Sequence, residues 1–174
     1  MKKGSPLPGV KRGVVVLCEP DPRWGELFEE EARQLRNVLG QLAIDIQHVG
    51  STAVPGLAAK PILDIAVGIR RIEDALLCRV PLETLGYDYA EGAGIEQNYV
   101  FGKGIDRTHL IHVVEYGGDI WQNYLRFRDA LRIDPELRCR YEILKRGLAM
   151  KHPEARALYT EAKGEFIRSV VEDR

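Results

Sequence analysis

The chain has 174 residues, of which 45% are hydrophobic and 29% are charged, and only nine are proline. Such a chain can bury one sizeable core, which disfavours a disordered protein, a collagen-like protein and a two-domain layout. Its 25 Lys and Arg residues balance 26 Asp and Glu residues, for a net charge of −1. We therefore expect no general nucleic-acid binding, which normally needs a basic excess, although a local pocket for one charged ligand stays open.

The N-terminal segment is basic and contains no apolar stretch of signal-peptide length. We expect residues 1–12 to form a flexible leader and residues 13–174 to form one domain. No apolar run approaches the roughly 20 residues of a bilayer-spanning helix. The cysteines Cys18, Cys78 and Cys139 include no CxxC pair, so we expect reduced thiols rather than a disulfide framework or a zinc site. These features predict a cytoplasmic protein without membrane contact.

Helix and strand patterns alternate through the first two-thirds of the chain. Apolar residues recur at spacings of three, four and seven after Asp21 and Pro22, a typical helix start, and Gly40 supplies a stop. Short β-branched runs indicate strands. In chain order we expect a helix from Asp21 to about Gly40, a strand at 44–49, a loop at 50–60, a buried strand at 61–69, short helices near 72–77 and 82–85, glycine-rich strands and turns over 86–104, and a last strand at 108–116.

The remaining third is predicted to be helical. Asp119 is a candidate N-cap for one helix, and Asp134 followed by Pro135 predicts the start of a second. Pro153 interrupts the pattern, which then resumes to the end of the chain. The C-terminal third of the chain is therefore expected to be α-helical.

The segment at 48–67 is the most informative stretch. A predicted strand runs into Gly50, Ser51 and Thr52, and a turn of small residues leads to Lys60 and the next strand. Backbone N–H groups and hydroxyls in such a turn can meet phosphate oxygens, which Lys60 can neutralise. It is not a Walker A loop, because the glycine spacing differs and a proline follows the lysine. The alternative is a structural turn with a Ser or Thr helix cap.

Asp64 is a carboxylate in the middle of an apolar strand. Period-two alternation puts it on one face with Ile62 and Ala66. An unpaired buried charge costs several kcal/mol, so Asp64 needs a partner: a metal ion, Lys60 or a histidine. An internal salt bridge without a catalytic role is the alternative.

Two histidines share the last predicted strand. His109 and His112 are three residues apart, and in a regular strand they face opposite sides, so one metal ion cannot bind both without a bulge. We expect a pocket between the Gly50–Ser51 turn and the strand of Asp64, with His112 facing Asp64. His109 is then expected to meet the helical layer or solvent. A hydrogen-bonded structural histidine is the alternative for His112.

The charges of the helical third have a simpler interpretation. Tyr159 and Lys163, four residues apart, can close over a pocket, although packing and solvent exposure are the commoner outcome for such a pair. The charged residues between positions 126 and 146 are expected to form a solvated face with mixed ion pairs. They are Arg126, Arg128, Asp129, Arg132, Asp134, Glu136, Arg138, Arg140, Glu142, Lys145 and Arg146.

Four segments together resemble the GrpB-like family. They read HVGSTAVPGLAAKPILDIAVGI, RTHLIHVVE, FRDALR and RALYTEAKGEFI, and the likeness runs from about Val14 to the C-terminus. The family looks like a small branch of the nucleotidyltransferase fold shared with DNA polymerase beta. The resemblance implies an α+β fold, with a mixed sheet flanked by helices and an α-helical C-terminal part.

The resemblance also implies a site. In that superfamily a Gly-Ser pair opens a short helix, two carboxylates alternate on the next strand, and a third comes from a later strand. Gly50, Ser51 and Asp64 match this pattern, whereas Ala66 replaces the second carboxylate and His112 stands where the third is expected. Asp64 and His112 can hold at most one ion, Mg²⁺ or Mn²⁺, so standard two-metal nucleotidyl transfer is in doubt.

Two hypotheses of different classes follow, and whether the chain is an enzyme stays open. In the first, a nucleotidyltransferase-like protein binds a nucleotide or another phosphorylated small molecule for metal-dependent nucleotidyl or phosphoryl transfer. In the second, a non-catalytic ligand-binding or chaperone-like module keeps the phosphate cradle with a degenerate metal site. Ala66 favours the second hypothesis, whereas Asp64 and His112 favour the first.

The first hypothesis gives each candidate residue a role. Asp64 and His112 would hold the metal or move a proton. The residues expected to bind substrate are His48, Gly50, Ser51, Thr52, Lys60, Arg107 and Lys163.

Overall fold

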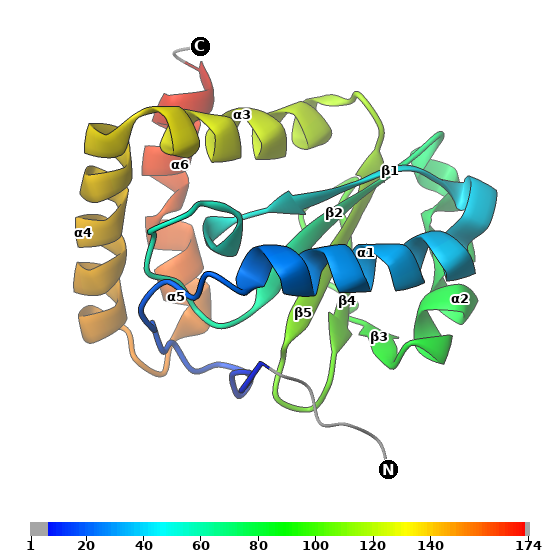
Figure 1. Cartoon of the computed structure of the whole chain (residues 1–174), viewed down its shortest axis with the longest axis horizontal. Coiled ribbons are helices and arrows are strands. Elements are labelled where there is room, and N and C mark those ends of the chain that lie inside the picture. The colour runs from blue at the N-terminus through cyan, green and yellow to red at the C-terminus, as the bar shows by residue number, and fades with distance from the viewer. Residues whose placement is uncertain (1–6, 173–174) are drawn as a thin grey trace.

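A computed structural model describes residues 7–172 of the chain. Within them, a five-stranded mixed sheet has the order β1-β2-β5-β4-β3. Only β2 and β5 run parallel to each other, and the other neighbours are antiparallel. Helices lie on both sides of this sheet, and α3 to α6 gather at one end of it (Figure 1). The α+β expectation is confirmed.

The strands and helices have the following bounds. The strands are β1 (Ala43–Val49), β2 (Leu63–Ile69), β3 (Tyr87–Tyr89), β4 (Tyr99–Lys103) and β5 (His109–Glu115). The α-helices are α1 (Trp24–Leu39), α2 (Arg79–Thr84), α3 (Asp119–Ile133), α4 (Pro135–Lys151), α5 (Arg156–Ala162) and α6 (Gly164–Glu172). Short 3₁₀ helices are η1 (Gly40–Leu42), η2 (Ser51–Ala53) and η3 (Ile72–Cys78). None of the helices described is long and apolar enough to cross a membrane.

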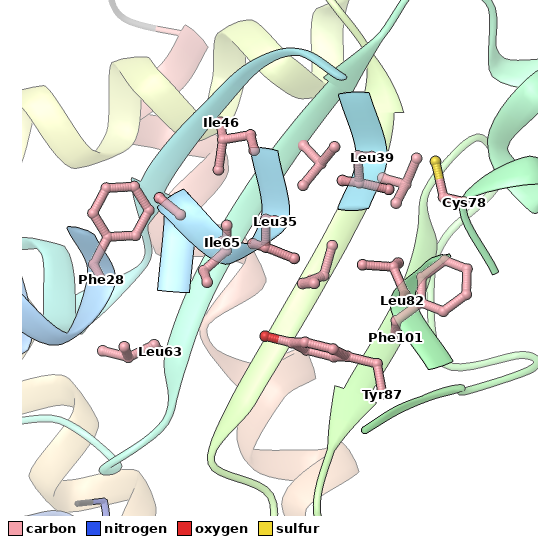
Figure 2. Close-up of a cluster of buried hydrophobic side chains, with 14 of the residues drawn as sticks. Phe28, Leu35, Leu39, Ile46, Leu63, Ile65, Cys78, Leu82, Tyr87 and Phe101 are labelled. Atoms are coloured by element: carbon pink, nitrogen blue, oxygen red, sulfur yellow. The ribbon is translucent and has the colours of Figure 1, made fainter. Parts of the chain in front are cut away.

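One face of the sheet packs against α1 and forms the larger hydrophobic core. Leu35 of α1 meets the odd-numbered residues of β2 and β5, including Ile65 and Ile111, and all three are fully buried (Figure 2). Burying a Leu or Ile side chain contributes roughly 1.5–3 kcal/mol. This face is therefore closed by packing, as the alternation in β2 predicts.

The opposite face packs against α3. Ala66 and Val114 contact Trp121, and a Cβ at Gly68 would lie 2.9 Å from the Trp121 ring, so this glycine allows the close approach. A further apolar cluster joins Leu57, in the loop after η2, to α3, α4 and α6. The C-terminal helices are thus fixed beside the loop that carries the candidate phosphate contacts.

Two predicted helix caps differ from the structure. α1 begins at Trp24, because the Asp21 carboxylate instead accepts hydrogen bonds from the backbone and the guanidinium of Arg23. Asp119 lies inside the first turn of α3, where Gly118 is the N-cap. The cap at Asp134 is confirmed, since its carboxylate accepts a hydrogen bond from the backbone N–H of Leu137 at 2.9 Å.

The expected leader needs a correction. Residues 1–6 lie outside the described part of the chain, but the backbones of Val10 and Arg107 exchange two hydrogen bonds of 3.0 and 2.9 Å. Arg12 also contacts Asp88 at 3.2 Å. Residues 7–12 therefore pack against the sheet, since an extended segment can pair with backbone groups that the short β4–β5 connection leaves open.

Candidate functional site

A cavity of about 830 Å³ opens between the sheet and the C-terminal helices. Side chains from β2, β5, the η2 turn, α4 and α5 line it. Most of the candidate residues predicted from sequence reach it: Ser51, Thr52, Lys60, Asp64, Arg107, His112 and Lys163. Their roles in binding or catalysis stay predictions.

Gly50 brings the turn directly against Asp64. Its φ is +70°, and a Cβ there would lie 2.8 Å from Asp64 Oδ2 and 3.0 Å from Asp64 Cβ. Both the backbone conformation and the space require a glycine. Ser51 and Thr52 then enter η2 and line the cavity beside the carboxylate.

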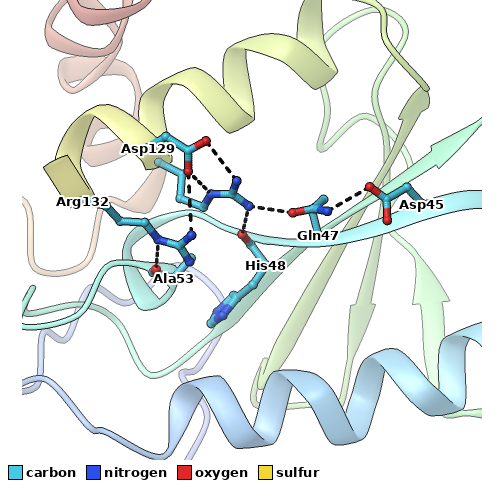
Figure 3. Close-up of polar contacts among 7 residues, drawn as sticks. Asp45, Gln47, His48, Ala53, Asp129 and Arg132 are labelled. Atoms are coloured by element: carbon cyan, nitrogen blue, oxygen red, sulfur yellow. Dashed lines mark hydrogen bonds and ion pairs between the residues drawn. The ribbon is translucent and has the colours of Figure 1, made fainter.

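Helix α3 holds this turn in place through two arginines. Arg128 donates hydrogen bonds to Gln47 Oε1 at 2.8 Å and to the backbone oxygen of His48 at 3.1 Å, and Arg132 donates to the backbone oxygen of Ala53 at 2.9 Å (Figure 3). These charge-assisted bonds to β1 and η2 satisfy loop carbonyls that have no sheet partner. The arginines of α3 therefore position the site rather than line the cavity.

Asp64 and His112 form a pair on neighbouring parallel strands. The Nε2 atom of His112 lies 3.3 Å from Asp64 Oδ1, and the Asp64 side chain is 32% exposed, toward the cavity. Burial raises the pKa of Asp64, but the hydrogen bond from His112 and the charges of Lys60 and Arg156 outweigh it and lower the pKa below its ordinary value. Asp64 is therefore an ionised carboxylate at neutral pH.

The second ring nitrogen of His112 faces two residues that the sequence did not single out. Tyr124 Oη lies 3.1 Å from His112 Nδ1, and Asn98 Nδ2 donates to Tyr124 Oη at 2.9 Å. Asn98 Nδ2 also lies 3.5 Å from His112 Nδ1, so both residues contact the same ring nitrogen. Tyr124 and Asn98 thus orient the histidine.

Three lysines lie at the helical side of the cavity, two of them beside Tyr159 and the third, Lys145, beside Tyr141. The Nζ atoms of Lys163 and Lys60 lie 4.3 Å and 5.5 Å from the Tyr159 ring centroid. Lys145 is only 1% exposed and donates to the backbone oxygen of Ala58. Burial lowers the pKa of Lys60 and of Lys145 to about 7 and that of Lys163 to about 8.

The cavity lining also includes Lys145, Arg156 and Tyr159. Of these three residues, the sequence suggested only Tyr159 as part of a pocket. Lys145 was expected on a solvated face, and this expectation is wrong because Ala58 and the C-terminal helices cover it. One signal was present in the sequence. Lys145 stands four residues after the buried Tyr141, and i,i+4 places both on one side of a helix.

The prediction that His48 lines the cavity is wrong. Alternation in β1 puts His48 on the α1 face with Ile46, where its ring stacks on Phe28 at 4.8 Å between centroids. Figure 3 shows the imidazole pointing toward α1. Burial lowers its pKa to about 4, so the ring is neutral at pH 7. Its Nε2 lies 2.9 Å from Thr52 Oγ1, so His48 stabilises the η2 turn from the α1 face of the sheet.

Arg107 and His109 have structural partners. Arg107 lines the cavity, but Asp88 accepts two hydrogen bonds from its guanidinium, at 2.5 and 2.6 Å, and neutralises its charge. His109 lies on the α1 face, 3.9 Å from Glu31 Oε2, and burial lowers its pKa to about 4. The prediction that His109 lies outside the cavity is confirmed.

The residues present do not fit a two-ion metal centre. Between residues 7 and 172, no three His, Cys, Asp or Glu side chains are grouped so that they could hold a metal ion. At position 66, the alanine is fully buried against Val49, Val114 and Trp121. Asp64 and His112 would offer two ligands to a single Mg²⁺ or Mn²⁺, and only after their mutual hydrogen bond opens.

This chain is similar to members of one protein family, and its fold is similar to that of a more distant protein. The family model described as GrpB protein matches residues 14–173. The glutamate-rich protein GrpB of Alkalihalophilus pseudofirmus is 37% identical over 95% of this chain and 98% of its own length. The crystal structure of conserved protein GrpB from Enterococcus faecalis superposes with a TM-score of 0.82 at 36% identity, over 91% of this chain and 96% of that one.

A more distant structural match comes from Cid1, solved in complex with the UTP analog UMPNPP. It is 14% identical, with a TM-score of 0.50 over 76% of this chain and 42% of that one. At this identity the match concerns the fold alone, and it agrees with the nucleotidyltransferase-like fold implied by the sequence.

Proposed function

The chain belongs to the GrpB family, and on that premise we propose that it binds a nucleotide or another phosphorylated small molecule in the cavity beside Asp64. One observation carries this proposal. Ser51 and Thr52 of η2 and the lysines Lys60 and Lys163 all line the cavity that Asp64 lines. Hydroxyls and ammonium groups around a turn are suitable donors for phosphate oxygens.

Each part of the site has a distinct task in this proposal. Ser51 donates a hydrogen bond to the phosphate, and Lys60 and Lys163 neutralise its charge. Thr52 keeps the turn in shape, because its hydroxyl is held by His48 Nε2 at 2.9 Å. The imidazole of His112 holds the Asp64 carboxylate in place, with Nε2 at 3.3 Å from Oδ1. Asp64 then accepts a hydrogen bond from a ligand hydroxyl that approaches through the cavity.

Metal-dependent nucleotidyl or phosphoryl transfer is a second candidate function, and the Asp64–His112 pair is the observation that favours it. A bound Mg²⁺ or Mn²⁺ would supply Lewis-acid polarisation of a phosphoryl oxygen. Asp64 and His112 would be its ligands, and Asp64 alone carries a negative charge. Ala66 instead favours a non-catalytic ligand-binding module, because it leaves the site one carboxylate short of the superfamily pattern.

A thermal-shift screen tests the main proposal. Nucleoside mono-, di- and triphosphates are compared with the unphosphorylated nucleosides, each with EDTA, Mg²⁺ or Mn²⁺. A ligand that binds only the native state adds about 2.7 kcal/mol of stability at a hundredfold excess over its Kd, so at least one phosphorylated compound raises Tm by several degrees. The nucleosides leave Tm unchanged. If millimolar concentrations of every phosphorylated compound have no effect, the proposal is wrong.

Calorimetric titration of Mn²⁺ separates the two candidate functions. We expect single-site, weak binding in the unmodified protein and none in Asp64→Asn, which keeps the side-chain shape and removes the charge. Unchanged binding in Asp64→Asn excludes Asp64 from the ion site. Two tightly bound ions in the unmodified protein contradict the fit described above and support two-metal transfer.

A further inference from the structure

The three lysines that line the helical side of the cavity differ from its other cations. Lys60, Lys145 and Lys163, called here the lysine cluster, have no carboxylate within 4.0 Å among the described residues. Lys145 is almost fully buried, and its Nζ has one backbone acceptor. Buried cations without counter-charges are costly, so a protein keeps them where a ligand supplies the missing charge.

The remaining charges of the cavity do not fill this gap. Arg12 and Arg107 both pair with Asp88. Asp64 is engaged by His112. Arg156 adds a further positive charge near Lys60 and Asp64. Glu91 and Glu161 line the cavity as exposed side chains. The inner part of the cavity therefore has a positive excess that only an anion can balance.

We infer that the lysine cluster anchors a chain of two or more phosphates without a divalent cation, an inference that rests on the proposed binding of a phosphorylated ligand. The site lacks the carboxylates that would hold a pair of ions. Three ammonium groups and Arg156 supply positive charge in their place. An isolated phosphate, with a charge near −2, balances only part of this excess, whereas a di- or triphosphate balances most of it.

The shape and chemistry of the rest of the cavity suit an organic group attached to such a chain. Ile62, Val100 and Leu110 contribute apolar surface to the same cavity. Ser51 also lines this cavity, where its hydroxyl is a neutral hydrogen-bond donor. A nucleoside diphosphate or triphosphate has the matching combination of polyanion and planar apolar group.

Depressed lysine pKa values agree with the same conclusion. Besides burial, repulsion from Arg156 and Lys163 lowers the pKa of Lys60, and repulsion from Lys163 and Lys60 lowers that of Lys145. A polyanion bound beside them reverses both effects and draws protons from solvent. Binding is then accompanied by net proton uptake near pH 7.5, which calorimetry in buffers of different ionisation enthalpy measures.

Isothermal calorimetry in EDTA tests the inference with inorganic orthophosphate, pyrophosphate and tripolyphosphate as probes, followed by ATP. We expect pyrophosphate and tripolyphosphate to bind more tightly than orthophosphate. Added Mg²⁺ leaves their affinity unchanged or lowers it, because Mg²⁺ neutralises the free polyphosphate. Lys163→Met and Lys145→Met each weaken pyrophosphate binding about tenfold, the usual effect of losing one charge-assisted hydrogen bond. Lys151→Met, an exposed position on α4, changes it less than twofold.

The outcomes separate this inference from the proposed function. If ATP binds only with Mg²⁺ or Mn²⁺, or if Lys163→Met and Lys145→Met bind pyrophosphate like the unmodified protein, the lysine cluster is not the anchor, although the proposed function survives. If no phosphorylated compound binds in any condition, both fail. Circular dichroism confirms that each variant is folded. Should Lys145→Met not fold, Lys163→Met decides the matter, because that side chain is only half-buried.

Discussion

The two faces of the sheet treat their charges differently, and the histidines of β5 mark the contrast. On the α1 face, His109 lies beside Glu31, which accepts hydrogen bonds from Tyr87 Oη at 2.8 Å and from Lys103 Nζ at 2.8 and 3.0 Å. On the cavity face, His112 meets Asp64, but within residues 7–172 no carboxylate lies within 4.0 Å of the nearby lysine cluster. Buried charge is paired on one face and left open on the other.

This difference separates structural charge from charge that is available to a ligand. A buried ion pair with full hydrogen bonding holds the fold together, and its loss is strongly destabilising. Unpaired buried cations instead reduce the stability of the free protein, so their removal is tolerated while ligand binding is lost. The contrast between Glu31 and Lys145 can therefore be tested on stability alone.

Loss of the Glu31 carboxylate is expected to have the largest effect. Glu31→Ala leaves Lys103 and Tyr87 without their acceptor in a buried cluster, and it lowers the free energy of unfolding by about 3–5 kcal/mol. Urea unfolding followed by circular dichroism measures this loss. Glu30→Ala, an exposed neighbour on the same helix, changes stability by less than about 0.5 kcal/mol. Equal effects of the two substitutions would show that the Glu31 cluster is not structural.

The turn on the cavity face is sensitive to a single methyl group. Gly50→Ala adds a Cβ at 2.8 Å from Asp64 Oδ2, on top of the cost of a positive φ. Gly56→Ala is the matched control, since its φ is +76° but nothing lies within 4 Å of the added Cβ. We expect Gly50→Ala to be about 2 kcal/mol more destabilising than Gly56→Ala in thermal or urea unfolding. Equal losses would mean that Asp64 shifts freely.

Regular strands made part of the site predictable. Alternation in β2 and β5 correctly separated Asp64 and His112 from His109, because neither strand contains a bulge. The Gly50–Ser51 turn was recognised from its place between two strands. The same rule, applied to β1, predicts that His48 lies outside the cavity, because His48 shares a face with the buried Ile46. We placed His48 in the cavity because it lies close to Gly50 in the sequence.

Other features depend on contacts between distant segments. Asn98 stands in a glycine-rich stretch without a periodic pattern, and only the fold brings it to Tyr124, 26 residues later. Lys145 lies on a helix rich in mixed charges, a pattern typical of a solvated face. It becomes buried because Ala58, 87 residues earlier, covers it. Side-chain composition alone does not reveal such coverage.

The lowered pKa of Lys145 makes stability depend on pH, with a smaller effect than the loss of Glu31 and with a sign that follows from the pKa. The Lys145 pKa falls from 10.5 in the unfolded chain to about 7 in the folded one, so the unfolded state binds more protons between these values and stability rises with pH there. The charges that act on this ammonium group are Lys60, Lys163, Arg146 and Glu142. Relative to Lys145→Met, the unmodified protein gains on the order of 2 kcal/mol from pH 7 to pH 9.

Urea unfolding at both pH values, without phosphate in the buffer, measures this difference. Identical slopes for the two proteins would show that Lys145 keeps an ordinary pKa in the folded state. A carboxylate partner, such as Lys103 has on the other face, would also give identical slopes, because a raised pKa lies above this pH range.

The most direct test of the contrast uses the two histidines of β5 as reporters. Protein with ¹⁵N-labelled histidine is titrated with the phosphorylated compound that binds most tightly, and the ring signals of His112 and His109 are assigned by substitution. Because the ligand occupies the cavity beside Asp64, the His112 signals shift on binding, whereas those of His109, shielded by the sheet, stay in place. Saturating binding that shifts His109 and leaves His112 unchanged would place the ligand elsewhere and contradict the account.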